Sequence, residues 1–149
     1  MEKLKGINLI GILVDKTRDH DFSGVIINQY DDRRIEFDSC MSMLNELDTI
    51  YDNWGFPEAS SKTRSFTMHR TDLTNEGEAV EKKKLTHIAA ETKPRDISQE
   101  RGKVATFHLL TEMRQHSSWQ GMVLHVEGDK KSRFDSVLDL LFLMDEALG

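Results

Sequence analysis

Two stretches near the N-terminus are rich in β-branched residues and leucine, and polar positions separate them. The apolar stretches are residues 7–14 and 24–30, and the polar residues 17–23 between them predict a hairpin connection. A turn at residues 31–32 is followed by residues 33–36, which predict a short third strand. We therefore expect a small antiparallel unit in the first third of the chain.

A helical pattern follows this unit. Asp38 and Ser39 are short polar residues that can accept hydrogen bonds from the first amides of a helix. From Cys40 to Tyr51, apolar residues recur at spacings of four, three and four, which gives one apolar stripe on a helix. The pattern predicts a helix that packs on one side.

The same order of patterns returns near the C-terminus at an offset of 97 residues. The matched pairs include Gly24 with Gly121, Phe37 with Phe134, Asp38 with Asp135, Ser39 with Ser136, Leu44 with Leu141, and Asp48 with Asp145. Residues 104–113, 121–126 and 132–133 predict strands, with a loop at 115–120. We predict an α+β fold made by internal duplication of a β-hairpin-plus-helix unit. Its strands form an antiparallel sheet, its two helices lie on one face, and the halves are related by a pseudo-twofold axis.

The second predicted helix, residues 137–148, is apolar almost all round. Only Asp139, Asp145 and Glu146 interrupt the apolar positions. Such a helix needs cover on more than one side. A homodimer would supply that cover, and the alternative is that the middle of the chain folds over the helix.

The chain divides into three parts within one compact domain. Residues 1–54 form the first repeat, residues 55–103 form a charged and partly mobile connection, and residues 104–149 form the second repeat. Inside the connection, residues 66–68 predict a short strand and residues 75–84 predict a marginal helix with little apolar surface to bury.

Composition indicates the number of domains, the expected partners and the location of the protein. The length of 149 residues fits one domain, and the net charge of −6 makes nucleic acid an unlikely partner. A single cysteine, Cys40, cannot form an internal disulfide and indicates a reducing, cytoplasmic setting. No apolar stretch approaches the roughly 18 residues that span a bilayer, so no membrane association is expected.

The predicted loop of the second repeat has the richest chemistry. Arg114 can bind a phosphate or carboxylate, His116 adds an imidazole, Trp119 can stack on a ring, and Gln120 adds an amide. These four residues predict a site for a small anionic or nucleotide-like ligand. In the alternative interpretation, Trp119 caps the core and Arg114 pairs with Glu112 or a helix carboxylate.

The first repeat places Arg18, His20 and Phe22 at the positions that match Arg114, His116 and Trp119. These three residues are therefore further ligand-binding candidates. One chain could present two related sites, or one site across the pseudo-twofold axis.

Motifs for catalysis are missing from the sequence. It contains no His-Glu-x-x-His pattern, no paired cysteines, no Gly-x-Ser-x-Gly and no phosphate-binding glycine loop. We therefore expect no enzyme activity, no catalytic residue, no metal and no cofactor. The expected function is a non-catalytic binding module, and the alternative is a protein-interaction or regulatory adaptor that docks through the apolar C-terminal helix.

The C-terminal motifs also resemble a family. Residues 113–121, which contain Arg-Gln and Trp-Gln-Gly, precede Phe134-Asp135-Ser136 and a leucine-rich helix. This order resembles a group of small uncharacterised proteins of Gram-positive anaerobes or their prophages, most clearly over the last 45 or so residues. The resemblance implies a soluble bacterial or phage protein, and it carries no catalytic residue across.

Overall fold

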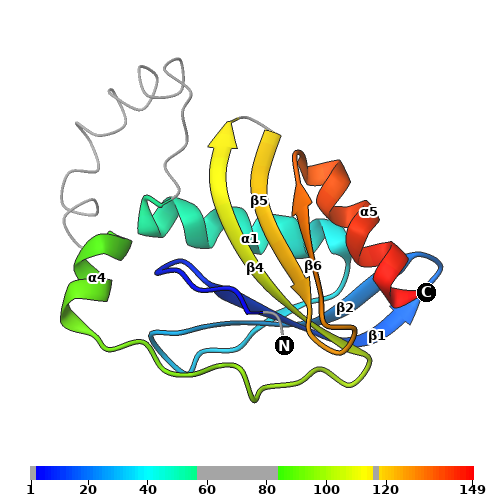
Figure 1. Cartoon of the computed structure of the whole chain (residues 1–149), viewed down its shortest axis with the longest axis horizontal. Helices are drawn as coiled ribbons and strands as arrows, with labels where there is room; N and C mark the ends of the chain where they lie inside the picture. Colours follow the sequence, from blue (N-terminus) through cyan, green and yellow to red (C-terminus); the bar gives the residue numbers. More distant parts are fainter. Residues whose placement is uncertain (1–2, 57–83, 116–117) are drawn as a thin grey trace.

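The fold is α+β, with a six-stranded antiparallel sheet and three helices in the described part of the chain. The computed structural model describes residues 3–56, 84–115 and 118–149. The strand predicted at residues 66–68 lies outside the described residues, as does all of the helix predicted at 75–84 except its last residue. Strand order in the sheet is β3-β2-β1-β4-β5-β6, so the two hairpins meet where β1 pairs with β4 (Figure 1).

All strands except β3, which has three residues where four are predicted, are longer than the sequence patterns predict. Their bounds are β1 Ile10–Arg18, β2 Asp21–Asn28, β3 Ile35–Phe37, β4 Ala105–Gln115, β5 Ser118–His125 and β6 Lys130–Phe134. The loop predicted at 17–23 is in fact a tight turn, because Asp19 and His20 both adopt positive φ, as a two-residue hairpin turn with the twist of its strands requires. The loop predicted at 115–120 is likewise mostly strand, and Trp119 and Gln120 belong to β5.

One long helix follows β3, and another follows β6. Helix α1 is Cys40–Trp54, and the Ser39 side chain accepts a hydrogen bond from the Ser42 amide in a reciprocal capping box. Helix α5 is Val137–Leu148, and Ser136 caps it by accepting from the Asp139 amide. Both helix starts are therefore where the sequence predicts them. The short helix α4, Leu85–Glu91, follows the predicted marginal helix and was not expected.

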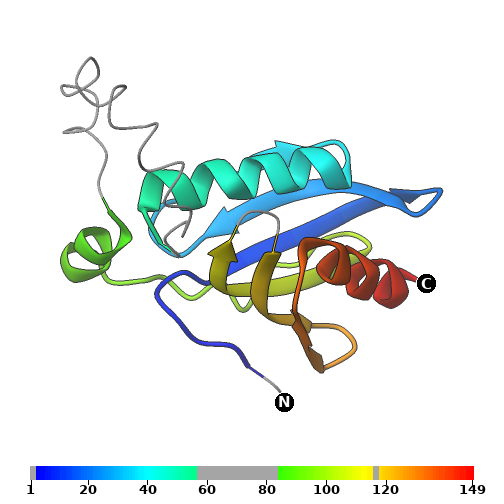
Figure 2. The same ribbon diagram turned by 90° about the horizontal axis from the view of Figure 1, so that it is seen from above.

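One face of the sheet carries both long helices. Helix α1 contacts β2 and β3, and α5 contacts β5 and β6, so each covers a different half of the sheet (Figure 2). Their buried residues share one core with alternate sheet residues, among them Ile12, Ile26 and Phe107. This core includes Tyr51 of α1 and Met144 of α5.

The opposite face carries no long helix among the described residues, and extended chain covers it instead. Leu13, Ile27 and Leu124 point to this side and form a second, smaller core with Leu9 and Ile97. Because Ile97 comes from the segment after α4, that segment and the N-terminal segment together cover the face (Figure 1). A cover of extended chain leaves more open space than a packed helix does, and this face holds the largest of the described pockets.

Candidate functional site

Arg114 is buried among helix carboxylates. Its side chain is 3% exposed, and it donates to Asp48 Oδ1 of α1 over 2.7 Å. Its second terminal nitrogen lies 3.1 Å from Asp52 Oδ1, and its guanidinium carbon lies 5.4 Å from the Tyr51 ring centroid. These contacts are the ones that the alternative interpretation of the sequence describes, pairing with a helix carboxylate.

Trp119 belongs to the core. It is 5% exposed, and its ring lies edge-on to Tyr51 with 5.7 Å between centroids. The Tyr51 hydroxyl and the Thr111 hydroxyl form a buried hydrogen bond of 2.8 Å, and burial raises the pKa of Tyr51. The indole therefore packs beneath α1, and Gln120 beside it is half-buried opposite Met113.

The matching residues of the first hairpin lie elsewhere. Phe22 is buried against Phe37, while Arg18 and His20 are exposed at the β1–β2 turn. His20 Nδ1 lies 3.1 Å from Asp145 Oδ2 of α5. The end of β4 and the end of β1 lie well apart (Figure 1), so the described side chains of the predicted set do not meet in one site. His116 falls outside the described residues.

A different cavity brings polar groups together on the face that lacks the long helices. It has a volume of about 990 Å³. Lys3, Lys5, Arg95 and Arg101 line it, with Asp96 as the carboxylate among the lining residues. Leu9, Ile97 and Leu124 supply apolar wall. We call this space the basic cavity. Its size suits a small molecule, and its charge suits an anion.

His108 stands at the centre of the sheet on the cavity wall. In β4 it lies opposite Gly11 of β1 and Leu124 of β5, and it is 6% exposed. Its Nε2 has no hydrogen-bond partner among the described residues. Burial lowers the pKa of His108, the Arg101 cation lowers it further, and the carboxylates of Glu127 and Asp96 oppose that shift. The imidazole is therefore neutral at pH 7.

Gln29 is a second residue of the same wall that carries a polar atom left unpartnered in the described part of the chain. Its Oε1 is buried and has no hydrogen-bond partner among the described residues. Its backbone carbonyl accepts from the Arg95 amide over 2.8 Å, and Arg95 Nε donates to the Asp31 carbonyl over 3.1 Å. These bonds fix the segment after α4 to the end of β2 and hold the cavity open between them.

Arg101 is anchored by its own loop. Its guanidinium donates to the carbonyls of Ser98 and Glu100, and it lies 4.0 Å from Glu127 Oε2. Arg101 therefore supplies positive charge from a fixed position. Lys3 and Lys5 are exposed on the N-terminal segment and can move toward a bound anion.

The buried His108 should make stability depend on pH. Its pKa is below 6.5 in the folded protein and about 6.5 when unfolded, so the unfolded chain binds more protons as the pH falls below that value. Wild type should therefore lose more free energy of unfolding between about pH 8 and about pH 5 than His108→Gln does. Urea titrations of both proteins across this range measure the difference, and parallel pH profiles would contradict the burial of a neutral imidazole.

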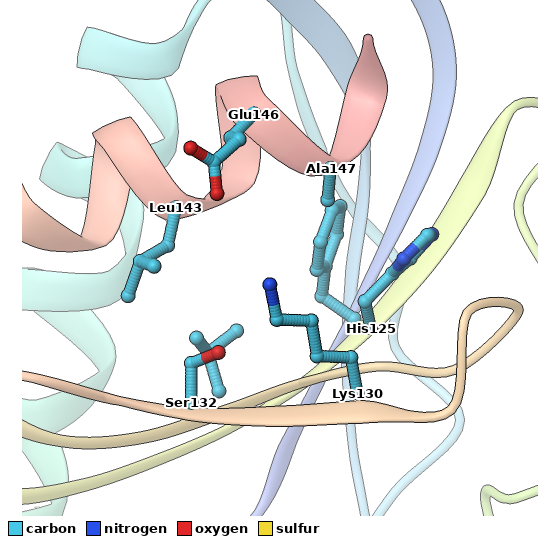
Figure 3. Close-up of a pocket in the computed structure, with 8 residues that line it drawn as sticks. His125, Lys130, Ser132, Leu143, Glu146 and Ala147 are labelled. Atoms are coloured by element: carbon cyan, nitrogen blue, oxygen red, sulfur yellow. The ribbon is translucent and has the colours of Figure 1, made fainter.

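A smaller pocket lies between α5 and the β5–β6 hairpin. Its volume is about 110 Å³, and both Lys130 and Glu146 point into it (Figure 3). Because these charges oppose each other and the space holds only a few waters, the pocket is a poor site for an ionic ligand. The basic cavity is therefore the better candidate site.

Comparison with known proteins does not assign the chain to a family. No protein-family model matches the chain, and neither the curated proteins nor the solved structures give a match. The resemblance based on the Trp-Gln-Gly and Phe-x-Ser patterns therefore stays a prediction. The candidate site depends on geometry alone.

No described group of three or more His, Cys, Asp or Glu side chains could hold a metal ion. No helix in the described ranges is long and apolar enough to cross a membrane.

Sequence reasoning missed the basic cavity because its residues are scattered. Lys5, Gln29, Arg95 and His108 come from four separate segments, and none of them stands in a motif. The available signal was His108 itself, a polar residue inside an apolar strand pattern. The sequence could not show which residue types lie across the sheet from it.

Proposed function

We propose that this protein is a non-catalytic binding module for a small amphipathic anion, held in the basic cavity. One observation carries the proposal: His108 and Gln29 line the same cavity, and each carries a buried side-chain atom, Nε2 and Oε1, that has no hydrogen-bond partner among the described residues. A buried polar group without a partner costs about 1–3 kcal/mol. A ligand that binds both atoms would remove that cost.

The charge of the lining supports an anion. Four cationic side chains and one carboxylate, Asp96, line the cavity, although the chain as a whole carries a net charge of −6. Local positive charge in an acidic protein attracts anions to that place and not to the rest of the surface. The apolar wall adds affinity for a ligand with an apolar body.

The surroundings of His108 favour binding over catalysis. A histidine that acts as a general base is usually oriented by a hydrogen-bonded carboxylate. Asp96 and Glu127, the carboxylates that raise the pKa of His108, act on the imidazole through their charge and not through a hydrogen bond. The expected small anionic ligand is therefore retained, and its proposed place moves from the Trp-Gln-Gly segment to the basic cavity.

A matched pair of aromatic ligands tests the charge requirement. Naphthalene-1-acetate should bind and should shift the NMR signals of the His108 imidazole, while the uncharged naphthalene-1-acetamide should bind more weakly. The double variant Lys3→Gln, Lys5→Gln should weaken binding of the acid about three- to tenfold, because exposed charges each contribute up to about 1 kcal/mol. Isothermal titration calorimetry at low salt measures both affinities.

A control double variant makes the same change of net charge outside the basic cavity. Lys16→Gln with Lys130→Gln removes two exposed lysines that do not line the basic cavity. This control should bind the acid as wild type does. Equal weakening in both double variants, or no binding of the acid at millimolar concentration, would argue against the proposed site.

We also infer that the fold arose by duplication, with its halves about a pseudo-twofold axis. Each hairpin contacts the helix of the other half: Arg114 binds Asp48 of α1, and His20 lies beside Asp145 of α5. Asp48 and Asp145 are matched positions at the offset of 97. Reciprocal contacts between matched positions are expected of two copies that share one core.

Self-association and docking through α5 stay predictions. Leu138 and Phe142 of α5 are 76% and 61% exposed, so the described part of one chain does not cover this side of the helix. The mass of the protein in solution would distinguish a homodimer from a monomeric adaptor. The cytoplasmic location expected from the single, half-buried Cys40 likewise stays a prediction.

A further inference from the structure

We infer that the ligand of the basic cavity carries an N–H or O–H donor on its apolar body in addition to its anionic group. This inference rests on the proposed function of that cavity. It selects a class of ligand, of which heteroaromatic acids such as indole carboxylates are examples, over simple hydrocarbon acids. The anionic group can be a carboxylate or a phosphate, since the basic side chains accept either.

The buried atom of Gln29 sets the requirement for a donor. Gln29 lines the cavity, and its Oε1 is a buried acceptor with no hydrogen-bond donor among the described residues. A hydrocarbon ligand would leave this oxygen unpaired, whereas a ligand N–H toward which the Gln29 amide turns would give it a hydrogen bond. Sites with such buried polar groups reject analogues that lack the matching group.

The neutral imidazole of His108 adds a second polar contact. Nε2 can donate or accept according to the tautomer, so it adapts to the ligand group that faces it. Leu124 and Ile97 line the cavity along with Gln29 and His108. The lining therefore provides apolar contact for the body of the ligand, with polar contacts at Gln29 and His108.

The experiment compares three acids of similar size on the full-length protein. Indole-3-acetate carries the N–H, 1-methylindole-3-acetate has the same ring without it, and naphthalene-1-acetate is the hydrocarbon analogue. Indole-3-acetate should bind at least about tenfold more tightly than the other two, which corresponds to one satisfied buried acceptor. Calorimetry gives the affinities, and the imidazole ¹⁵N signals of His108 report contact at the site.

A pair of variants assigns the preference to one atom. Gln29→Leu removes the acceptor with little change in volume, so it should bind all three acids with similar affinity. Gln120→Leu makes the same substitution at a half-buried position of β5 that does not line the basic cavity. It should keep the preference for the N–H of indole-3-acetate.

Each result separates this inference from the proposed function. If the three acids bind wild type equally, the donor requirement is wrong and the anion-binding function stands. If Gln29→Leu keeps the preference for indole-3-acetate, the assignment to Gln29 is wrong. If none of the acids binds, the proposed function fails together with the inference.

Discussion

Replacing Trp119 with alanine should cost about 3–5 kcal/mol of unfolding free energy, the range measured for large aromatic residues in protein cores. The indole is 5% exposed and packs edge-on against Tyr51, with the buried Tyr51–Thr111 hydrogen bond beside it. Truncation removes the apolar burial of the ring and leaves a cavity beneath α1 that rigid strands cannot close. Urea unfolding followed by far-UV circular dichroism measures the loss.

An exposed aromatic residue provides the control for Trp119. Phe142 on α5 is 61% exposed, so Phe142→Ala should change stability by no more than about 0.5 kcal/mol. A small loss for Trp119→Ala would mean that the indole is not a core residue and would return it to the list of ligand-stacking candidates. A large loss of stability in Trp119→Ala, with unchanged binding of naphthalene-1-acetate, would show that Trp119 acts in folding and not in ligand binding.

The architecture could be read from local patterns because those patterns have local causes. Runs rich in β-branched residues and leucine predict the strands, and Asp38-Ser39 and Asp135-Ser136 predict where α1 and α5 begin. The hairpin connections were predicted too long for the same reason. The apolar positions of a strand end before its backbone pairing does. In β1 the apolar run stops at Val14, whereas the pairing with β2 continues to Arg18.

The candidate site could not be read in this way. Arg114 has the composition of a ligand-binding residue, but its role depends on Asp48 and Asp52, which lie more than sixty positions away in sequence. The basic cavity depends on how the segment after α4 crosses the sheet near His108. Contacts between residues distant in sequence decide which charged side chains form ion pairs and which line a cavity. Local sequence patterns carry no information about such contacts.

Removing the charge of Arg114 should also lower the free energy of unfolding by a large amount. Arg114→Met keeps the apolar stem and leaves Asp48 and Asp52, whose side chains are 54% and 48% exposed and remain solvated by water. We expect a loss of about 2–3 kcal/mol, from the two ion pairs and the contact with Tyr51. The same urea titration measures it.

Removing the carboxylate charges should lower the free energy of unfolding more than removing the charge of Arg114 does. The double variant Asp48→Asn, Asp52→Asn keeps the guanidinium at 3% exposure and removes the charges of the two carboxylates that lie 2.7 and 3.1 Å from it, so about 3–5 kcal/mol of unfolding free energy should be lost. The difference arises because water can reach the carboxylates and cannot reach the cation. A smaller loss for the double variant than for Arg114→Met would show that Asp48 and Asp52 do not compensate the charge of Arg114, and the β4–β5 hairpin would then need another explanation for its contact with α1.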